Sequence, residues 1–264
     1  MSLRYLDKVA IVTGGSKGIG KGTVRVFVQN GAKVVFCARG RADGETLEAE
    51  LNKEGPGSCT FVSCDMSKED NIERLINFTV ERHGRIDCLV NNAGWHPPHK
   101  PIDQTTAEEF RDLLNLNVVS YFLASKYALP HLRKCQGNII NVSSLVATIG
   151  QIDAVSYVAT KGAIISMTKA MAVDESQYNV RVNCISPGNV MTPLWEELAG
   201  QTADAAAAIK NGQNCQLFGR MGTEEECGRA ILFLAVDATF CTGIDLLFSG
   251  GAELNYGYKT RILS

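Results

Sequence analysis

Short apolar runs alternate with longer amphipathic stretches along most of the chain. The apolar runs predict strands at residues 9–12, 33–37, 59–64, 86–90, 138–142, 180–185 and 243–248. The amphipathic stretches predict helices between them, including one from the end of the first turn to about Asn30, others at 43–54 and 68–83, and one from Tyr157 to about Val173. We expect Gly31 to end the first helix and Ser67 to cap the helix over 68–83.

This alternation predicts an α/β fold of the Rossmann type: a doubly wound parallel sheet of about seven strands with helices on both faces. The crossover connections are expected to be right-handed. The chain contains no linker, charge block or repeat, so residues 1–264 are expected to form a single domain. A less regular insertion at about 188–222 is expected to supply loops that bind substrate.

Charge and composition restrict the partners of the protein. The 26 basic and 28 acidic residues leave a net charge of −2, which provides no basic field for nucleic acid or an anionic membrane surface. No apolar run reaches the roughly 18 residues of a membrane-spanning helix. The start of the chain lacks an apolar signal segment, and the nine cysteines form no CxxC pair. We therefore expect a cytoplasmic protein with small buried cysteines and no metal site.

A glycine-rich turn follows the first predicted strand, with the sequence TGGSKGIG at 13–20. Its spacing differs from the common GxGxxG fingerprint of dinucleotide sites. Its position between a strand and a helix nevertheless favours a nucleotide site, because backbone N–H groups and a helix N-terminus bind pyrophosphate. A turn that is glycine-rich only for conformational reasons is the alternative. We expect Gly20 to let the helix pack close to the sheet, and cofactor contacts from Gly14, Ser16, Lys17, Gly18, Ile19 and Gly20.

The end of the second strand bears on the choice between NAD and NADP. An NAD site usually has an acidic residue there, whereas this chain has Ala38 followed by Arg39. Arg39 and Lys17 are suited to neutralise a 2′-phosphate, which favours NADP. The alternative is a solvated Arg39, with Asp43 or Glu45 turning toward the ribose of NAD.

Two later strand ends fit a cofactor at the carboxyl edge of the sheet. Asp65 is placed to bond the adenine amino group, and NNAG at 91–94 provides amides and a close backbone approach from Asn92, Ala93 and Gly94. Both segments also suit ordinary turns, since Asp, Asn and Gly all favour turns.

Tyr157 and Lys161 lie four positions apart in a helical segment, so their side chains share one helix face. A cation beside the phenol is expected to lower the tyrosine pKa from its usual value near 10, giving an acid and base for neutral pH. A surface tyrosine beside a solvated lysine is the alternative. Ser144, just past the fifth strand, is placed to hydrogen-bond a substrate oxygen. Asn117 lies in a helical pattern that asparagine does not favour, which suggests a polar role.

Together these motifs resemble the short-chain dehydrogenase/reductase family over nearly the whole chain. The resemblance implies a catalytic tetrad of Asn117, Ser144, Tyr157 and Lys161. In this tetrad Tyr157 exchanges a proton with the substrate hydroxyl and Ser144 orients the substrate oxygen. Lys161 bonds the nicotinamide ribose and depresses the pKa of Tyr157, while Asn117 positions a water. Hydride passes between the substrate carbon and the nicotinamide of NAD or NADP. The expected cofactor contacts further include Met66, Tyr157, Lys161, Pro187, Gly188, Val190 and Thr192.

Longer matches, such as NNAGWHPP and TPLWEEL, are similar to a branch of this family that acts on 17β-hydroxysteroids and L-fucose-type sugars. That branch implies a cytosolic homotetramer that prefers NAD and converts a secondary alcohol to a ketone or lactone. An apolar wall with hydrogen-bonding points is expected around the substrate, from His96, Ser144, Gln151, Tyr157 and Trp195. Packing of Trp195 and a loop role of His96 are the structural alternatives. The functional alternatives are a reductase of other small carbonyl compounds and a non-catalytic cofactor-sensing module.

Overall fold

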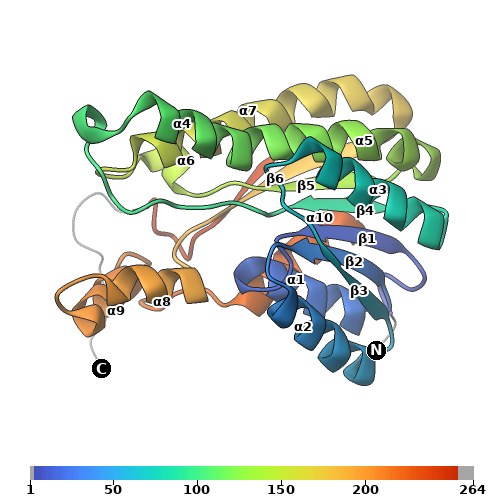
Figure 1. Cartoon of the computed structure of the whole chain (residues 1–264), viewed down its shortest axis with the longest axis horizontal. Helices are drawn as coiled ribbons and strands as arrows, with labels where there is room; N and C mark the ends of the chain where they lie inside the picture. Colours follow the sequence, from blue (N-terminus) through green and yellow to red (C-terminus); the bar gives the residue numbers. More distant parts are fainter. Residues whose placement is uncertain (1–2, 255–264) are drawn as a thin grey trace.

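Seven parallel strands form one sheet at the centre of the computed structural model, which describes residues 3–254 (Figure 1). Their spatial order is β3-β2-β1-β4-β5-β6-β7. The bounds are β1 Val9–Thr13, β2 Lys33–Ala38, β3 Ser58–Ser63, β4 Cys88–Asn91, β5 Asn138–Val142, β6 Arg181–Pro187 and β7 Asp245–Phe248. All seven strands predicted from the apolar runs are confirmed, because strands buried on both faces read as nearly continuous hydrophobic segments.

Helices cover both faces of the sheet, as expected for a doubly wound fold (Figure 1). One face packs against α1 (Gly18–Gln29), α2 (Arg41–Glu54) and α10 (Glu224–Val236). The other face packs against α3 (Glu69–His83), α5 (Ser120–Cys135) and α7 (Val155–Glu175). Neighbouring residues of β1 alternate between the two cores: Val12 joins the first and Ile11 the second.

Four short helices lie outside these two layers. Helix α4 (Ala107–Leu114) leads through a π-helical turn at Asn115–Val119 into α5, and α6 (Val146–Ile149) precedes α7. Helices α8 (Pro193–Gly200) and α9 (Ala205–Asn214) occupy the expected insertion at 188–222 and project beyond the sheet (Figure 1). The insertion is therefore largely helical.

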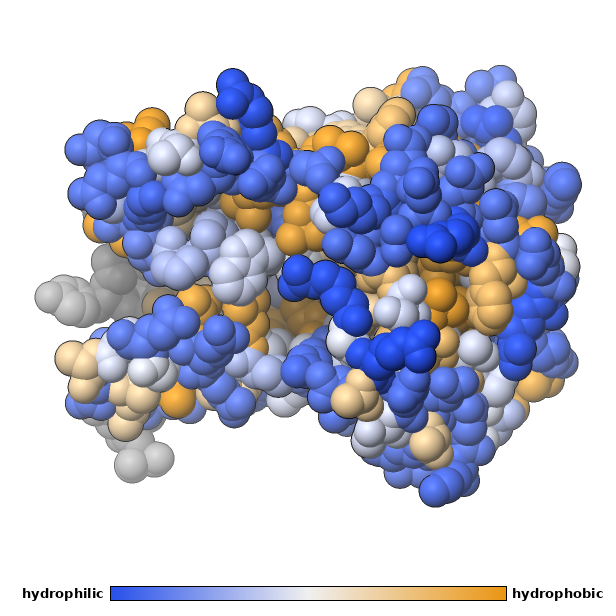
Figure 2. All heavy atoms as spheres, in the orientation of Figure 1, coloured by the Kyte–Doolittle hydropathy of each residue, from blue (hydrophilic) through white to orange (hydrophobic). Residues whose placement is uncertain are grey.

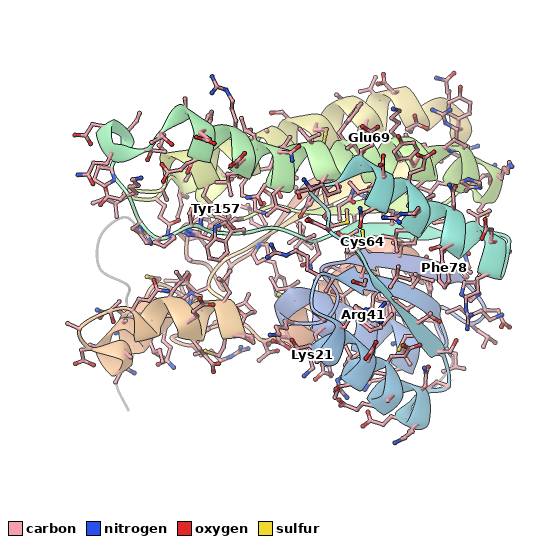
Figure 3. All side chains as sticks on the ribbon, in the orientation of Figure 1. Lys21, Arg41, Cys64, Glu69, Phe78 and Tyr157 are labelled. Atoms are coloured by element: carbon pink, nitrogen blue, oxygen red, sulfur yellow. The ribbon has the colours of Figure 1, made fainter. Side chains whose placement is uncertain are left out.

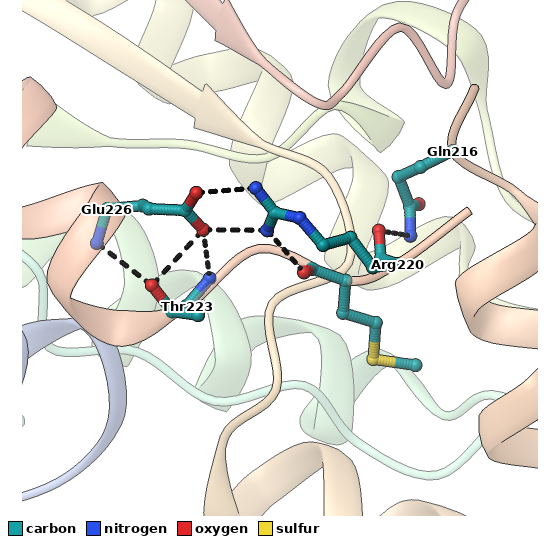
Figure 4. A network of polar contacts seen from close by, with 5 residues as sticks. Gln216, Arg220, Thr223 and Glu226 are labelled. Carbon is teal, nitrogen blue, oxygen red and sulfur yellow. Dashed lines mark hydrogen bonds and ion pairs between the residues drawn. The ribbon is translucent and has the colours of Figure 1, made fainter. Parts of the chain in front are cut away.

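The end of this insertion is fastened to α10 by a polar network (Figure 4). The hydroxyl of Thr223 accepts a hydrogen bond from the backbone N–H of Glu226, whose carboxylate in turn accepts the N–H of Thr223. Arg220 forms a two-pronged ion pair with Glu226 at 2.6 and 2.9 Å, and these contacts lower the pKa of Glu226 to about 2. The network joins the segment that follows α9 to the first turn of α10.

The structure confirms one predicted helix boundary and contradicts one predicted helix cap. Gly31 follows the first helix with φ of +88°, as a glycine that ends a helix should, so this prediction is confirmed. Ser67 as the cap of α3 is wrong, because Lys68 occupies the capping position without a side-chain bond. The hydroxyl of Ser67 instead donates to the carboxylate of Asp65 at 2.8 Å.

The nine cysteines form no disulfide bond. Six of them are buried, and the exposed one is Cys215. No helix among residues 3–254 is long and apolar enough to cross a membrane. The described residues also contain no group of histidines, cysteines and acids that could hold a metal ion.

Candidate active site

The glycine turn connects the carboxyl end of β1 to the N-terminus of α1. Gly14 and Gly18 have φ values of +65° and +58°, which side chains other than glycine rarely adopt. A Cβ atom on Gly20 would lie 2.1 Å from the carbonyl oxygen of Gly14. The absence of a side chain at Gly20 therefore lets the start of α1 lie directly against Gly14 in the same turn. Close packing of α1 on a neighbouring element occurs at Gly22 instead, and the neighbour is the backbone of Glu224 on α10, not the sheet.

A hydrogen-bond network joins this turn to the end of β4. The hydroxyl of Thr13 accepts the backbone N–H groups of Asn92 and Ala93 at 2.9 and 3.0 Å. The side-chain amide of Asn92 donates back to the carbonyl groups of Thr13 and Gly14 at 2.9 and 3.1 Å. Strands β1 and β4 flank the point where the strand order reverses, which is where doubly wound sheets bind ligands. Thr13 is a residue that the sequence reasoning missed, and only its place beside the first glycine hinted at it.

The end of β2 carries the charges expected to select the cofactor. Arg39 is exposed, and its side chain has no hydrogen-bond or ion-pair partner among residues 3–254. Lys17 forms an ion pair with Asp43 at 2.8 Å. Asp65 accepts the backbone N–H of Ser67, which lowers the pKa of this carboxyl group, and Arg39 contributes to the same shift. Met66 is buried, with its sulfur 3.7 Å from that of Cys37.

Lys161 is buried on the inner side of α7, with 4 % of its surface exposed. Its ammonium group donates to the carbonyl oxygen of Val142, at the end of β5, over 2.9 Å. The hydroxyl of Ser143 donates to the carbonyl of Lys161 at 2.8 Å, so a second hydrogen bond links α7 to the end of β5. Burial lowers the pKa of Lys161 from 10.5 to about 8.

Tyr157 shares this face of α7, with the Lys161 nitrogen 5.7 Å from the centre of its ring. Burial raises the pKa of Tyr157 to about 12, and a hydrogen bond with Ser144 opposes this rise. The expected lowering of the tyrosine pKa by the lysine is therefore wrong. The desolvation of the phenol outweighs the influence of a cation that lies beyond hydrogen-bond distance.

Asn117 lies in the π-helical turn between α4 and α5, a feature that is frequent at functional sites. Its side-chain oxygen accepts the backbone N–H of Trp95 at 2.9 Å. Its amide nitrogen donates to the carbonyl of Trp95 and to the hydroxyl of Thr160, which the sequence reasoning also missed. Asn117 thus ties the segment after β4 to α7, three residues beyond Tyr157.

His96 covers Tyr157, with the two ring centres 4.2 Å apart. Its Nε2 atom lies 3.0 Å from the side-chain oxygen of Gln151, so two of the expected substrate residues contact each other. Trp195 lies elsewhere: its indole nitrogen donates to Asn189, and its ring fills the space beside Gly212. Trp195 therefore packs α8 against α9 in this structure.

A cleft of about 370 Å³ lies between the glycine turn, the segment after β4, α7 and the overhanging α8 (Figures 2 and 3). Glycines of the first turn, the end of β4, Tyr157 and Lys161 all line it. Thr192 lines it from the other side and caps α8, and Pro193 follows as the first residue of that helix. The segment that leads from β6 to this cap contains three other predicted cofactor residues, Pro187, Gly188 and Val190. Glu197 on α8 also lines the cleft, and the sequence reasoning missed it.

The cleft fits a dinucleotide on structural grounds. Gly14 and Gly18 leave the backbone uncovered at the N-terminus of α1. The first turn of this helix carries no acidic residue. Such a terminus favours a phosphate group. Gly94 leaves open the space in front of Asn117 and Lys161, whose side-chain atoms lie 3.3 and 3.7 Å from the position of a Cβ atom there.

Comparison with known proteins agrees with this geometry. A family model described as short chain dehydrogenase matches residues 8–203. L-fucose dehydrogenase of Bos taurus is 56 % identical over 259 residues, covering 98 % of this chain and 94 % of that protein. Cyclopentanol dehydrogenase of Comamonas testosteroni is 34 % identical, covering 96 % and 99 %. The ligand-free aldohexose dehydrogenase of Thermoplasma acidophilum superposes with a TM-score of 0.88 at 30 % identity, covering 99 % of this chain and 100 % of that one. The chain belongs to the short-chain dehydrogenase family and is an NAD(P)-dependent oxidoreductase of the alcohol dehydrogenase type.

Proposed function

We propose that the protein oxidises the ring hydroxyl of an L-fucose-type sugar to a lactone, with Tyr157 as the acid and base. The observation that supports this proposal best is that Tyr157 and Lys161 line the same cleft as the glycine turn. The names of several relatives point to the same substrate class, including the L-fucose dehydrogenases of Bos taurus and Mus musculus. A 17β-hydroxysteroid is the second candidate, because Trp95 and Leu194 give the cleft an apolar wall.

In the proposed mechanism each residue of the tetrad has one task. Ser144 orients the substrate oxygen, and Tyr157 accepts the proton of the reacting hydroxyl group. Lys161 stays buried and cationic beside the phenol and stabilises the tyrosinate that forms. Asn117 holds the backbone of Trp95 and, with it, the wall of the cleft. A nicotinamide nucleotide held by the glycine turn and the segment after β4 would supply the acceptor for the hydride of the carbon that bears this hydroxyl group.

For the cofactor, we propose a preference for NADP. The free guanidinium of Arg39 at the end of β2 is suited to bind a 2′-phosphate in a two-pronged manner. Ala38 itself adds no carboxylate beside Arg39 that would repel the phosphate. The ion pair between Lys17 and Asp43 favours the same choice, because it balances the charge of a carboxylate that could otherwise bond the ribose of NAD.

We further propose a cytoplasmic homotetramer. Large apolar side chains stay exposed on two faces of the single chain, which supports burial between copies. One group lies on the π-helical turn and α5, with Val119 and Phe122. The other lies on α10, the turn that follows it and the edge strand β7, with Phe233, Phe240 and Leu247.

The mechanism is tested by replacing Tyr157 with phenylalanine. We expect turnover to fall by at least about 100-fold, the range typical for loss of a general base, while nucleotide affinity is kept. Tyr127→Phe, at a half-buried tyrosine of α5 that bonds Glu69 and does not line the cleft, is the matched control and should keep full activity. Full activity of Tyr157→Phe would reject the mechanism.

The substrate is tested by following absorbance at 340 nm with NAD and NADP against L-fucose, estradiol and simple secondary alcohols. The highest kcat/KM is expected for L-fucose. Preference for estradiol would favour the steroid, and preference for small ketones in the reverse direction would favour a carbonyl reductase. Nucleotide binding without any turnover would favour a cofactor-sensing module.

A further inference from the structure

A single carboxylate lines the active-site cleft and has no part in the proposed reaction. Glu197, on α8, is the only acidic side chain among the residues within 3–254 that line this cleft. Its side chain is exposed and forms no hydrogen bond or ion pair with any described residue. The cleft therefore contains a free, charged hydrogen-bond acceptor opposite the catalytic tetrad.

The helical spacing of α8 places this carboxylate on the side of the helix that borders the cleft. Pro193, Leu194 and Glu197 all line the cleft, and separations of one and four residues put them on one stripe of the helix. Trp195 and Ala199 lie on the opposite stripe, where Trp195 packs toward α9 and Ala199 is buried. The packing of this second stripe therefore fixes which residues of α8 border the cleft.

The polar groups on the facing wall already have partners. The two ring nitrogens of His96 lie 2.6 Å from the carbonyl oxygen of Pro97 and 3.0 Å from the side-chain oxygen of Gln151. The side-chain amide of Asn92 donates to the glycine turn, and the ammonium group of Lys161 donates to the end of β5. A substrate with several hydroxyl groups therefore finds its free charged acceptor on α8.

The charges around the cleft disfavour an anionic substrate. Lys17 is paired with Asp43 at 2.8 Å, and Lys161 donates to a backbone carbonyl, so neither cation is paired with Glu197. The phosphate groups of a nicotinamide nucleotide would add further negative charge. A carboxylate or sulfate on the substrate would therefore be repelled, whereas hydroxyl groups can donate to Glu197.

We propose that Glu197 recognises the substrate by accepting hydrogen bonds from sugar hydroxyl groups that lie away from the reacting carbon. An ionised carboxylate has two oxygens and only accepts hydrogen bonds, which suits the neighbouring hydroxyl groups of a sugar. Tyr157, across the cleft from α8, takes the reacting hydroxyl group (Figure 3). This inference rests on the proposed sugar oxidation and names the residue that separates neutral sugars from sugar acids and from steroids.

A cycle of changes in the sugar and in the protein tests this pairing. The measured quantity is kcat/KM for L-fucose and for its 2-, 3- and 4-deoxy forms, with the nucleotide that supports faster turnover at saturation. In the wild type at least one deoxy sugar should lose about tenfold, the range for a hydrogen bond to a charged group. In Glu197→Ala, kcat/KM for L-fucose should fall by about the same factor, and the same deoxy sugar should lose nothing further. The effect should appear mainly in KM, because these hydroxyl groups do not react.

Two further variants separate the charge of Glu197 from a general effect on α8. Glu196→Ala is the matched control, because Glu196 is exposed on the same helix and does not line the cleft; its kinetics should match the wild type. Alanine favours helices, so both alanine variants are expected to keep α8. Glu197→Gln removes the charge at nearly constant size. It should raise kcat/KM severalfold for L-galacturonate, which carries a carboxylate in place of the methyl group of L-fucose.

The outcomes distinguish this inference from the function on which it rests. The inference is overturned if every deoxy sugar loses the same factor in the wild type and in Glu197→Ala. It is also overturned if Glu197→Ala raises the KM of the nucleotide and leaves that of the sugar unchanged, since Glu197 would then serve the cofactor. In both cases L-fucose is still oxidised and the proposed function stands. Absence of L-fucose turnover in the wild type would overturn the proposed function and this inference with it.

Discussion

Replacing Lys161 by methionine is expected to stabilise the free protein at pH 7, although the proposed reaction needs this lysine. The side chain is almost fully buried, and burial lowers its pKa from 10.5 to about 8. At about 1.4 kcal/mol per pH unit, this difference corresponds to a penalty of roughly 3 kcal/mol for keeping the ammonium group charged inside the protein. Methionine has a similar length and carries no such penalty.

The lost hydrogen bond opposes this gain. The Lys161 ammonium donates to the carbonyl of Val142 at 2.9 Å, and a bond to a charged group is worth about 1.5–3 kcal/mol. The carbonyl does not become unpaired, because the hydroxyl of Tyr121 also donates to it at 3.2 Å. We therefore expect a net increase in the free energy of unfolding of up to about 2 kcal/mol at pH 7.

The dependence on pH separates the two contributions. Between pH 8 and 10.5 the unfolded chain binds more protons at Lys161 than the folded chain does, so wild-type stability rises with pH. The advantage of the methionine variant should therefore shrink by roughly 2.5 kcal/mol between pH 7 and pH 10. Titration of Tyr157, whose pKa is about 12 in the folded protein, is common to both proteins and cancels in the difference.

Urea unfolding of both proteins without cofactor, at equal protein concentration and at four pH values from 7 to 10, measures this difference. Lys169→Met, an exposed substitution on the same helix, should show little dependence of the difference on pH. A stability difference between Lys161→Met and wild type that stays the same from pH 7 to pH 10 would refute the reasoning.

Three further substitutions test other parts of the structure. Ala38→Asp should shift the ratio of kcat/KM values for NADP and NAD toward NAD by about tenfold or more, because it adds a carboxylate beside the proposed phosphate site. An unchanged ratio would mean that this strand end does not select the cofactor. Gly22→Ala should lower the free energy of unfolding by about 1–3 kcal/mol, because its Cβ would lie 2.2 Å from the carbonyl oxygen of Glu224. Gly162→Ala, with no neighbouring atom within 4 Å of its Cβ, should instead raise it by about 0.5–1 kcal/mol, so equal effects of the two glycine substitutions in urea unfolding would contradict the packing of α1 on α10.

The fold and the centre of the candidate site were predictable from sequence because they depend on local patterns. Each strand is a short apolar run, and parallel strands buried on both faces keep that pattern without interruption. The glycine turn follows β1 directly, and Tyr157 and Lys161 share a helix face by their spacing alone. The strand order then brings these distant segments to one edge of the sheet.

The remaining features depend on contacts between segments far apart in the chain. Thr13 joins β1 to β4 through residues almost eighty positions away, and Trp195 turns toward Gly212 instead of the cleft. The sequence determined which groups are present and which helix carries them. The tertiary structure decided the pKa values of Tyr157 and Lys161, because burial and desolvation arise only when the layers pack together.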